Sequence, residues 1–156
     1  MKKIAKLATL LLTITAPVWA QTSKHAQMEK RIINPWGWQD ERSYVQAVEA
    51  KHVESTLYIS GQTAISDDGI SSNDDMKTQL IKALQNLETV ISKAGYKPGG
   101  IVRLNIYTTS TSELLSNFKI FQDWAVRNGV KQALTLLEVK SLFETLKVEL
   151  EATVVK

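Results

Sequence analysis

The end of the chain carries the pattern that most restricts the fold. From Leu146 to Val155, apolar and polar residues alternate. Leu146, Val148, Leu150, Ala152 and Val154 would share one face, and Lys147, Glu149, Glu151 and Thr153 the other. A period of two residues is typical of a β-strand with one buried face. Such a strand is not stable alone, so the rest of the chain must supply a sheet and a layer that covers it.

The remaining patterns supply both. Met76 to Ala94 predicts the clearest helix, because its apolar residues recur at intervals of three and four. A second helix is expected from Ser110 to Arg127, where Ser110 and Glu113 have capping-box spacing. Four further strands are expected, at residues 44–49, 56–65, 101–108 and 134–139. The order β-β-α-β-α-β-β predicts a single α+β domain, one sheet with two helices on one face.

The first twenty residues have the three-part layout of a secretory signal peptide. Lys2, Lys3 and Lys6 precede an apolar run at residues 7–18, and small residues stand at the positions read for cleavage after Ala20. The run would rise about 18 Å as a helix, which is short of a hydrocarbon core of roughly 30 Å. We expect cleavage near Ala20, a periplasmic or secreted protein, and no membrane attachment afterwards.

The charge balance excludes one large class of partner. The 156-residue chain has 19 basic and 16 acidic side chains. The three lysines of the predicted signal peptide account for the difference, so the mature chain is neutral. Proteins that bind nucleic acid through its phosphates carry excess positive charge. We therefore expect no nucleic-acid partner.

Metal and histidine chemistry are also not expected. The chain has no cysteine, and its two histidines, His25 and His52, stand outside the predicted helices and strands. A zinc site needs several nitrogen or sulfur ligands, and a catalytic triad needs an imidazole held on a rigid element. We expect neither.

Residues 21–43 show no clear period. We expect a flexible polar leader at residues 21–30 and then a short tryptophan-rich segment, with the folded domain at residues 44–156. Trp36 and Trp38 either bind a partner or ligand or cover an edge of the core.

Two features of the predicted strands could carry chemistry. Glu149 and Glu151 would share one face about 6.8 Å apart, a spacing that suits an acid–base pair. From spacing alone, the preferred interpretation is a solvated or salt-bridged sheet face with Lys147 nearby. Gly61, which follows Ser60 at a strand end, allows the close approach of a ligand or of a neighbouring strand.

Two motifs in this order and spacing resemble one known family. Ser60-Gly61-Gln62 ends a predicted strand, and Val148-Glu149-Leu150-Glu151-Ala152 lies in the last strand. With the residues between them they resemble the RidA/YjgF family of reactive-intermediate deaminases, once labelled endoribonucleases, from about Tyr44 to Lys156. The resemblance implies a chorismate-mutase-like α+β fold and a homotrimer with ligand clefts between subunits. It also implies hydrolysis of enamines or imines to a keto acid and ammonia, without metal or cofactor.

The resemblance also implies roles for individual residues. The family's cleft residues match Tyr44, Ser60, Gly61 and Asn117, and its water-handling glutamate matches Glu149. The arginine that binds the substrate carboxylate has no match, because Leu134 takes its position. Leu136 replaces a small cleft residue two positions later.

The missing arginine favours a binding protein over an enzyme. A hydrogen bond to a charged group contributes roughly 1.5–3 kcal/mol, and an apolar wall would desolvate a carboxylate without a partner. Arg127 or Lys131 could substitute. The first interpretation is an exported homotrimer that binds a small metabolite in inter-subunit clefts. The alternative is an enamine/imine deaminase with an altered substrate, and the minor alternative is an endoribonuclease. Another cation in the crevice beside Tyr44 would overturn the preference for a non-catalytic binder.

Overall fold

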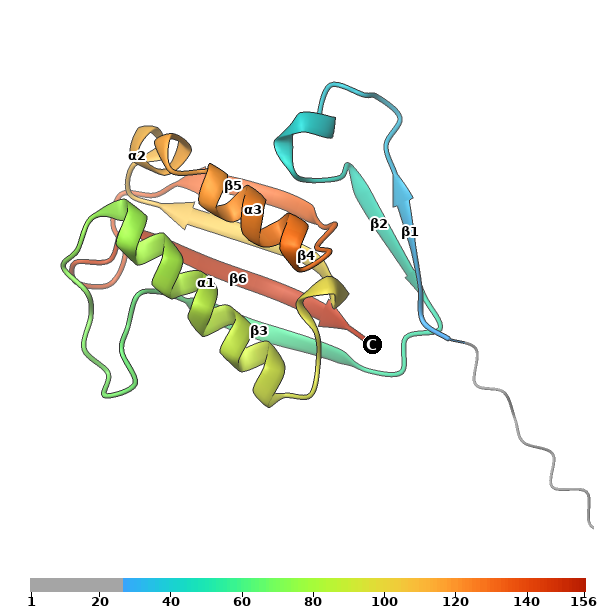
Figure 1. The fold of residues 1–156 in the computed structure, drawn as a ribbon, viewed down its shortest axis with the longest axis horizontal. Helices are drawn as coiled ribbons and strands as arrows, with labels where there is room; N and C mark the ends of the chain where they lie inside the picture. The colour runs from blue at the N-terminus through green and yellow to red at the C-terminus, as the bar shows by residue number, and fades with distance from the viewer. Residues whose placement is uncertain (1–26) are drawn as a thin grey trace, which may run out of the picture.

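The computed structural model describes residues 27–156, so the predicted signal peptide and most of the leader lie outside the described residues. The centre is a four-stranded sheet in the order β3-β6-β4-β5 (Figure 1). Its strands are β3 (Thr56–Gln62), β4 (Ile101–Thr108), β5 (Ala133–Glu138) and β6 (Val148–Val155). β4 and β5 run parallel, and β6 is antiparallel to both of its neighbours. The alternating segment therefore forms a central strand, as its pattern predicts.

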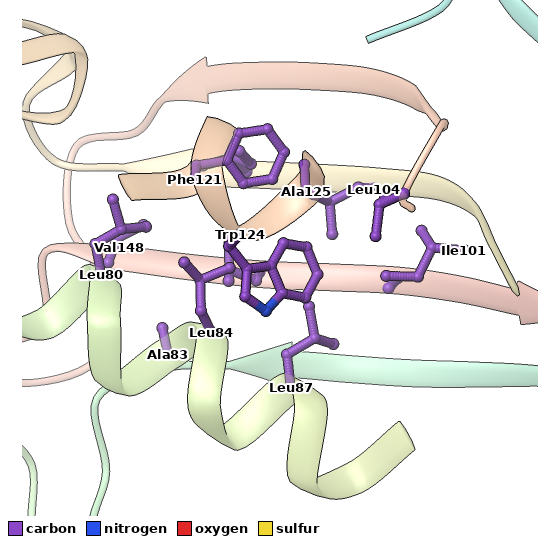
Figure 2. Packing of buried hydrophobic residues seen from close by; sticks show 14 of the residues in the cluster. Leu80, Ala83, Leu84, Leu87, Ile101, Leu104, Phe121, Trp124, Ala125 and Val148 are labelled. Carbon is purple, nitrogen blue, oxygen red and sulfur yellow. The ribbon is translucent and has the colours of Figure 1, made fainter. Parts of the chain in front are cut away.

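Two helices cover one face of this sheet, which confirms the predicted α+β fold. α1 (Met76–Lys93) and α3 (Lys119–Arg127) lie on the same side (Figure 1). The apolar stripe of α1 is buried, with Leu80, Leu87 and Ile91 fully inaccessible. Figure 2 shows leucines of α1 pointing toward Trp124 of α3 above the sheet. Among residues 27–156, no helix lies on the opposite face of the sheet (Figure 1).

The second predicted helix is in fact two. α2 (Thr111–Ser116) ends at Asn117, and α3 begins at Lys119. The Asn117 side chain donates to the carbonyl of Glu113 (2.9 Å). Asparagine competes in this way with helix hydrogen bonding, so the helix ends there although the apolar spacing continues. The predicted cap is confirmed, since the Ser110 hydroxyl accepts from the Glu113 N–H.

The leader contributes a strand that the sequence pattern did not predict. β1 (Glu29–Ile33) pairs antiparallel with β2 (Ala47–Lys51), so Glu29 and Lys30 are in a strand rather than a flexible leader. The Lys30 ammonium donates to the carbonyls of Gly99 and Ile101, both at 2.8 Å. These two bonds tie β1 to η2 (Pro98–Gly100) and the start of β4. Pairing and anchoring, rather than an apolar face, hold this strand.

The β1–β2 pair is a separate two-stranded sheet, and the segment just before β2 meets the edge strand β5 at an isolated bridge. Val45 bridges in parallel to Ala133, and its N–H donates to the carbonyl of Gln132 (3.0 Å). The segment before β2 therefore runs along the free edge of β5. Within residues 27–156, no helix is long and apolar enough to cross a bilayer.

Gln79 is a buried polar link between α1 and the sheet. Its side-chain amide donates to the carbonyls of Ser72, Asp74 and Thr145, and its carbonyl accepts from the Lys147 N–H (2.8 Å). The side chain is fully inaccessible, so water cannot replace these partners. Gln79 thereby connects the start of α1 to the segment that leads into β6.

We expect Gln79→Leu to lower the free energy of unfolding by about 2–4 kcal/mol, because it leaves buried backbone groups without partners. Urea denaturation measures this change. Gln85→Leu is the matched control, since Gln85 is an exposed residue of the same helix and should change stability by less than about 0.5 kcal/mol. Equal losses in both variants would contradict the linking role.

Candidate functional site

A hollow of about 410 Å³ lies against the β5 strand. Its lining residues are Glu41, Arg42, Tyr44, Leu115, Phe118, Gln122, Leu134 and Leu136. Leu134 and Leu136 stand in register with buried Leu104 and Ile106, on the face that the helices cover. Both also pack against the core. The structure thus brings together three of the residues singled out from the sequence, Tyr44, Leu134 and Leu136.

Arg42 lines this hollow beside Tyr44. It is the last residue of η1 (Asp40–Arg42), and Ser43 after it adopts the left-handed conformation (φ 58°). Its guanidinium carbon lies 5.4 Å from the centre of the Trp38 ring, which is a cation–π distance. Trp38 meets Tyr44 edge-on, with 6.4 Å between ring centres. Among the carboxylate side chains that the structure describes, which do not include that of Asp40, none forms an ion pair with Arg42.

Arg127 and Lys131 were the substitutes expected from the sequence, and Arg42 was not among them. Lys131 lines a neighbouring hollow of about 330 Å³ that shares Tyr44. Arg127 is not among the residues that line either hollow. The sequence did offer one indication of Arg42, because it stands only two residues before Tyr44, the predicted cleft tyrosine. Its direction depends on the turn at Ser43, which the sequence does not reveal.

The two tryptophans do not cover the core. Trp36 and Trp38 are 59% and 56% exposed, and their rings stack with centres 6.4 Å apart. They form an aromatic surface next to Tyr44 and Arg42. In a single chain, therefore, these rings are not buried at a core edge.

Glu149 lies at a different place, next to Gly61. It sits on β6 between buried Val148 and Leu150, so it belongs to the face without helices. A β-carbon built on Gly61 would lie 1.7 Å from Oε1 of Glu149. Ser60 and Gly61 fall where the β3–β6 register shifts. The glycine therefore makes room for the carboxylate, which is the close approach its position predicted.

The two glutamates of β6 have different surroundings. Glu151 accepts hydrogen bonds from the Tyr107 hydroxyl (2.9 Å) and the Asn105 amide (3.2 Å). The first of these raises the pKa of Tyr107 above its ordinary value. Glu149 has no such hydrogen bond within the described residues, and Lys147 pairs with Glu113 instead (3.7 Å). Of the two, Glu149 is therefore the glutamate whose carboxylate has no hydrogen-bond donor among the described residues.

One chain does not gather all the predicted site residues. Ser60, Gly61 and Glu149 lie on β3 and β6, whereas Leu134 and Leu136 lie on β5 at the other edge of the sheet and on its other face. Asn117 lies at the α2–α3 junction, and its neighbour Phe118, not Asn117, lines the hollow. Within residues 27–156, no cluster of three or more histidine or carboxylate side chains could hold a metal ion.

The contact between Gly61 and Glu149 leads to a prediction. We expect Gly61→Ala to displace the Glu149 carboxylate. For any reaction in which Glu149 takes part, this should lower turnover about 100-fold, the usual effect of misplacing a reacting group by about 1 Å. Initial-rate kinetics measure this change. In a Glu149→Gln background the same substitution should cost little further activity. Full additivity of the two losses would show that Gly61 acts by another route.

Comparison with known proteins places these residues in a family. The family model described as "Endoribonuclease L-PSP" matches residues 39–156. A RutC family protein of Aquifex aeolicus is 33% identical over 113 residues, which cover 72% of this chain and 88% of that protein. A 2-iminobutanoate/2-iminopropanoate deaminase of Salmonella typhimurium is 25% identical over 72% of this chain and 87% of its own length.

Solved structures agree with this result. YyfB of Yersinia pestis, described as a protein of unknown function of the Rid family, has a TM-score of 0.72 and 29% identity, and covers 81% of this chain and 98% of that one. The yjgF gene product of E. coli has a TM-score of 0.61 and 23% identity, and covers 72% and 87%, so it shows the fold alone. The matched family model and the curated relatives together show that this chain belongs to the RidA/YjgF family.

Proposed function

We propose that the protein is a hydrolase that deaminates imines or enamines of 2-keto acids. The observation that carries this proposal is the position of Arg42, which lines the same hollow as Tyr44, Leu134 and Leu136. Its guanidinium can bind a substrate carboxylate through two parallel hydrogen bonds. Arg42 would thereby take the role of the family's arginine, whose position Leu134 occupies in this chain. The deaminase of Salmonella typhimurium, at 25% identity, is a relative in this reaction class.

Glu149 supplies the acid–base group in this proposal. Water adds to the imine carbon while a carboxylate takes one of its protons, and the same carboxylic acid then protonates the nitrogen. This gives a carbinolamine, from which the same carboxylate takes the hydroxyl proton and passes it to the amine nitrogen. As the carbonyl forms, the carbon–nitrogen bond breaks, and a keto acid and ammonia leave. The reaction consumes one water and needs no redox partner. A carboxylate without a hydrogen-bond donor in the described residues suits this proton transfer better than Glu151, which Tyr107 and Asn105 engage.

We further propose that a second copy completes the site. Arg42 and Glu149 lie at separate places in one chain, and no helix of the described part of the chain covers the face that carries Glu149 (Figure 1). Tyr58 on this sheet is 79% exposed. A homotrimer with clefts between subunits would cover that face and bring Glu149 of one copy to the hollow of the next. Size-exclusion chromatography with light scattering tests the assembly.

Export is part of the same proposal. Residues 1–20 have the layout of a signal peptide. Expression of the full chain followed by fractionation should recover a protein whose amino terminus is near residue 21. Recovery of the uncleaved chain in the cytoplasmic fraction would contradict export.

A non-catalytic binder is the second candidate, and the apolar side of the hollow favours it. Leu115, Phe118, Leu134 and Leu136 could retain an apolar ligand without any chemistry. RNA cleavage has less support, because His52, which is exposed, is the single histidine among residues 27–156.

One assay separates these functions. An amino-acid oxidase with catalase produces 2-imino acids in the presence of the protein, and semicarbazide traps the imine that remains. If the protein lowers the amount of semicarbazone that forms and ammonia is released, the result supports the hydrolase. Thermal stabilisation by keto acids without faster hydrolysis supports the binder. If the protein neither speeds hydrolysis nor is stabilised by keto acids, both functions are excluded.

A further inference from the structure

We infer that the preferred substrate carries a large apolar side chain, as do the 2-imino acids related to leucine and phenylalanine. This inference rests on the proposed hydrolase function and specifies its substrate class. It follows from the division of the hollow into one charged end and one apolar wall.

The apolar wall is rigid because the core supports it. Leu134 and Leu136 belong to β5 and pack against the buried cluster beneath the helices. Phe118 is held against buried Phe121, with 5.1 Å between ring centres. A wall fixed in this way keeps its shape whether or not a ligand is present, so it selects ligands by size and polarity.

Leu115 extends this wall toward solvent. It belongs to α2, lines the hollow and is 56% exposed. Covering a large exposed aliphatic side chain with an apolar group removes apolar surface from water, which makes binding more favourable. A substrate with a single methyl group would leave Leu115 in contact with water, whereas an isobutyl or benzyl group could reach it.

The charged end comes from another element. Glu41 and Arg42 belong to η1, and the Gln122 amide donates to the carbonyl of Glu41 (3.3 Å), which fixes η1 to α3. Trp38 supports the Arg42 guanidinium from one face. A substrate whose carboxylate meets Arg42 would therefore extend its side chain along the leucines of the wall.

The size of the hollow agrees with this class. About 410 Å³ lies within the range of roughly 300–1,000 Å³ found for small-molecule sites. Each additional methylene in a hydrophobic pocket changes kcat/KM about 10- to 200-fold. We expect kcat/KM for the leucine-derived imine to exceed that for the alanine-derived imine by at least about 10-fold.

The test compares imines that an oxidase generates from alanine, 2-aminobutyrate, leucine and phenylalanine, with the full chain as catalyst. A preference for the leucine and phenylalanine products supports the inference. Equal rates, or a preference for the alanine product, would overturn it and leave the hydrolase function standing. Absence of hydrolysis with all four substrates would contradict the hydrolase function itself.

A variant tests whether the wall causes the preference. Leu115→Ser should lower kcat/KM for the leucine-derived imine about 10-fold and should lower it for the alanine-derived imine much less, so the ratio of the two values falls. Ile70→Ser is the matched control, because Ile70 is similarly exposed (64%) but lines another hollow, beside α1. A preference that survives Leu115→Ser unchanged, or that is lost equally in both variants, would contradict a role for this wall.

Discussion

Arg42→Gln is expected to lower kcat/KM for 2-imino acids about 10- to 100-fold, because it removes a charged hydrogen-bond donor worth roughly 1.5–3 kcal/mol. Arg42 lines the hollow together with Tyr44. The loss should appear mainly in KM if Arg42 binds substrate and transition state equally. Arg42→Lys should recover only part of the activity, since an ammonium keeps the charge and loses the paired geometry.

Arg127→Gln is the matched control. Arg127 is an exposed arginine at the end of α3 that lines neither hollow beside Tyr44. We expect its kinetics to equal those of the wild type. If Arg127→Gln loses activity and Arg42→Gln does not, the assignment of the carboxylate anchor to Arg42 is wrong. Neutral imine analogues that lack the carboxylate should be insensitive to both substitutions.

Glu149→Gln is expected to lower kcat about 100- to 10,000-fold, the range for loss of a general acid–base group. The amide is nearly isosteric with the carboxylate and cannot exchange the proton. KM and the stabilisation by keto acids should change little, because Glu149 does not line the hollow proposed to bind the substrate side chain. Initial rates and thermal shift measured on the same samples separate the two effects.

Glu151→Gln controls for charge on the same strand. Glu151 accepts hydrogen bonds from Tyr107 and Asn105 and is more exposed than Glu149. We expect a much smaller loss of kcat than for Glu149→Gln. Comparable losses in the two variants would indicate that the charge of this face, rather than proton transfer at Glu149, supports the reaction.

A mixture of the two inactive variants tests the shared site. If Arg42 of one copy serves the same cleft as Glu149 of the next, Arg42→Gln and Glu149→Gln chains that are unfolded and refolded together should form some intact clefts. Random assembly would restore one cleft in four, and therefore about a quarter of wild-type activity. If the mixture is no more active than the separate variants, either both residues act within the same chain or they do not share a site.

Local patterns predicted the parts of this fold that depend on burial of one face. The stripe of α1 and the alternation of β6 follow from helical and strand periods, and both elements occur as predicted. β1 was not predicted because its stability comes from pairing with β2 and from the Lys30 bonds to the carbonyls of Gly99 and Ile101. Such partners are remote in sequence and leave no local period.

The candidate site shows the same division. The sequence determined which residues resemble a family's cleft. It also predicted that Gly61 allows the close approach of a ligand or of a neighbouring strand. Only the tertiary structure identified this neighbour as Glu149 and brought Arg42 to the hollow beside Tyr44. The reason is physical. A period reports which face of an element is buried, whereas the direction of an exposed arginine depends on a turn and on an aromatic support that lie outside that period.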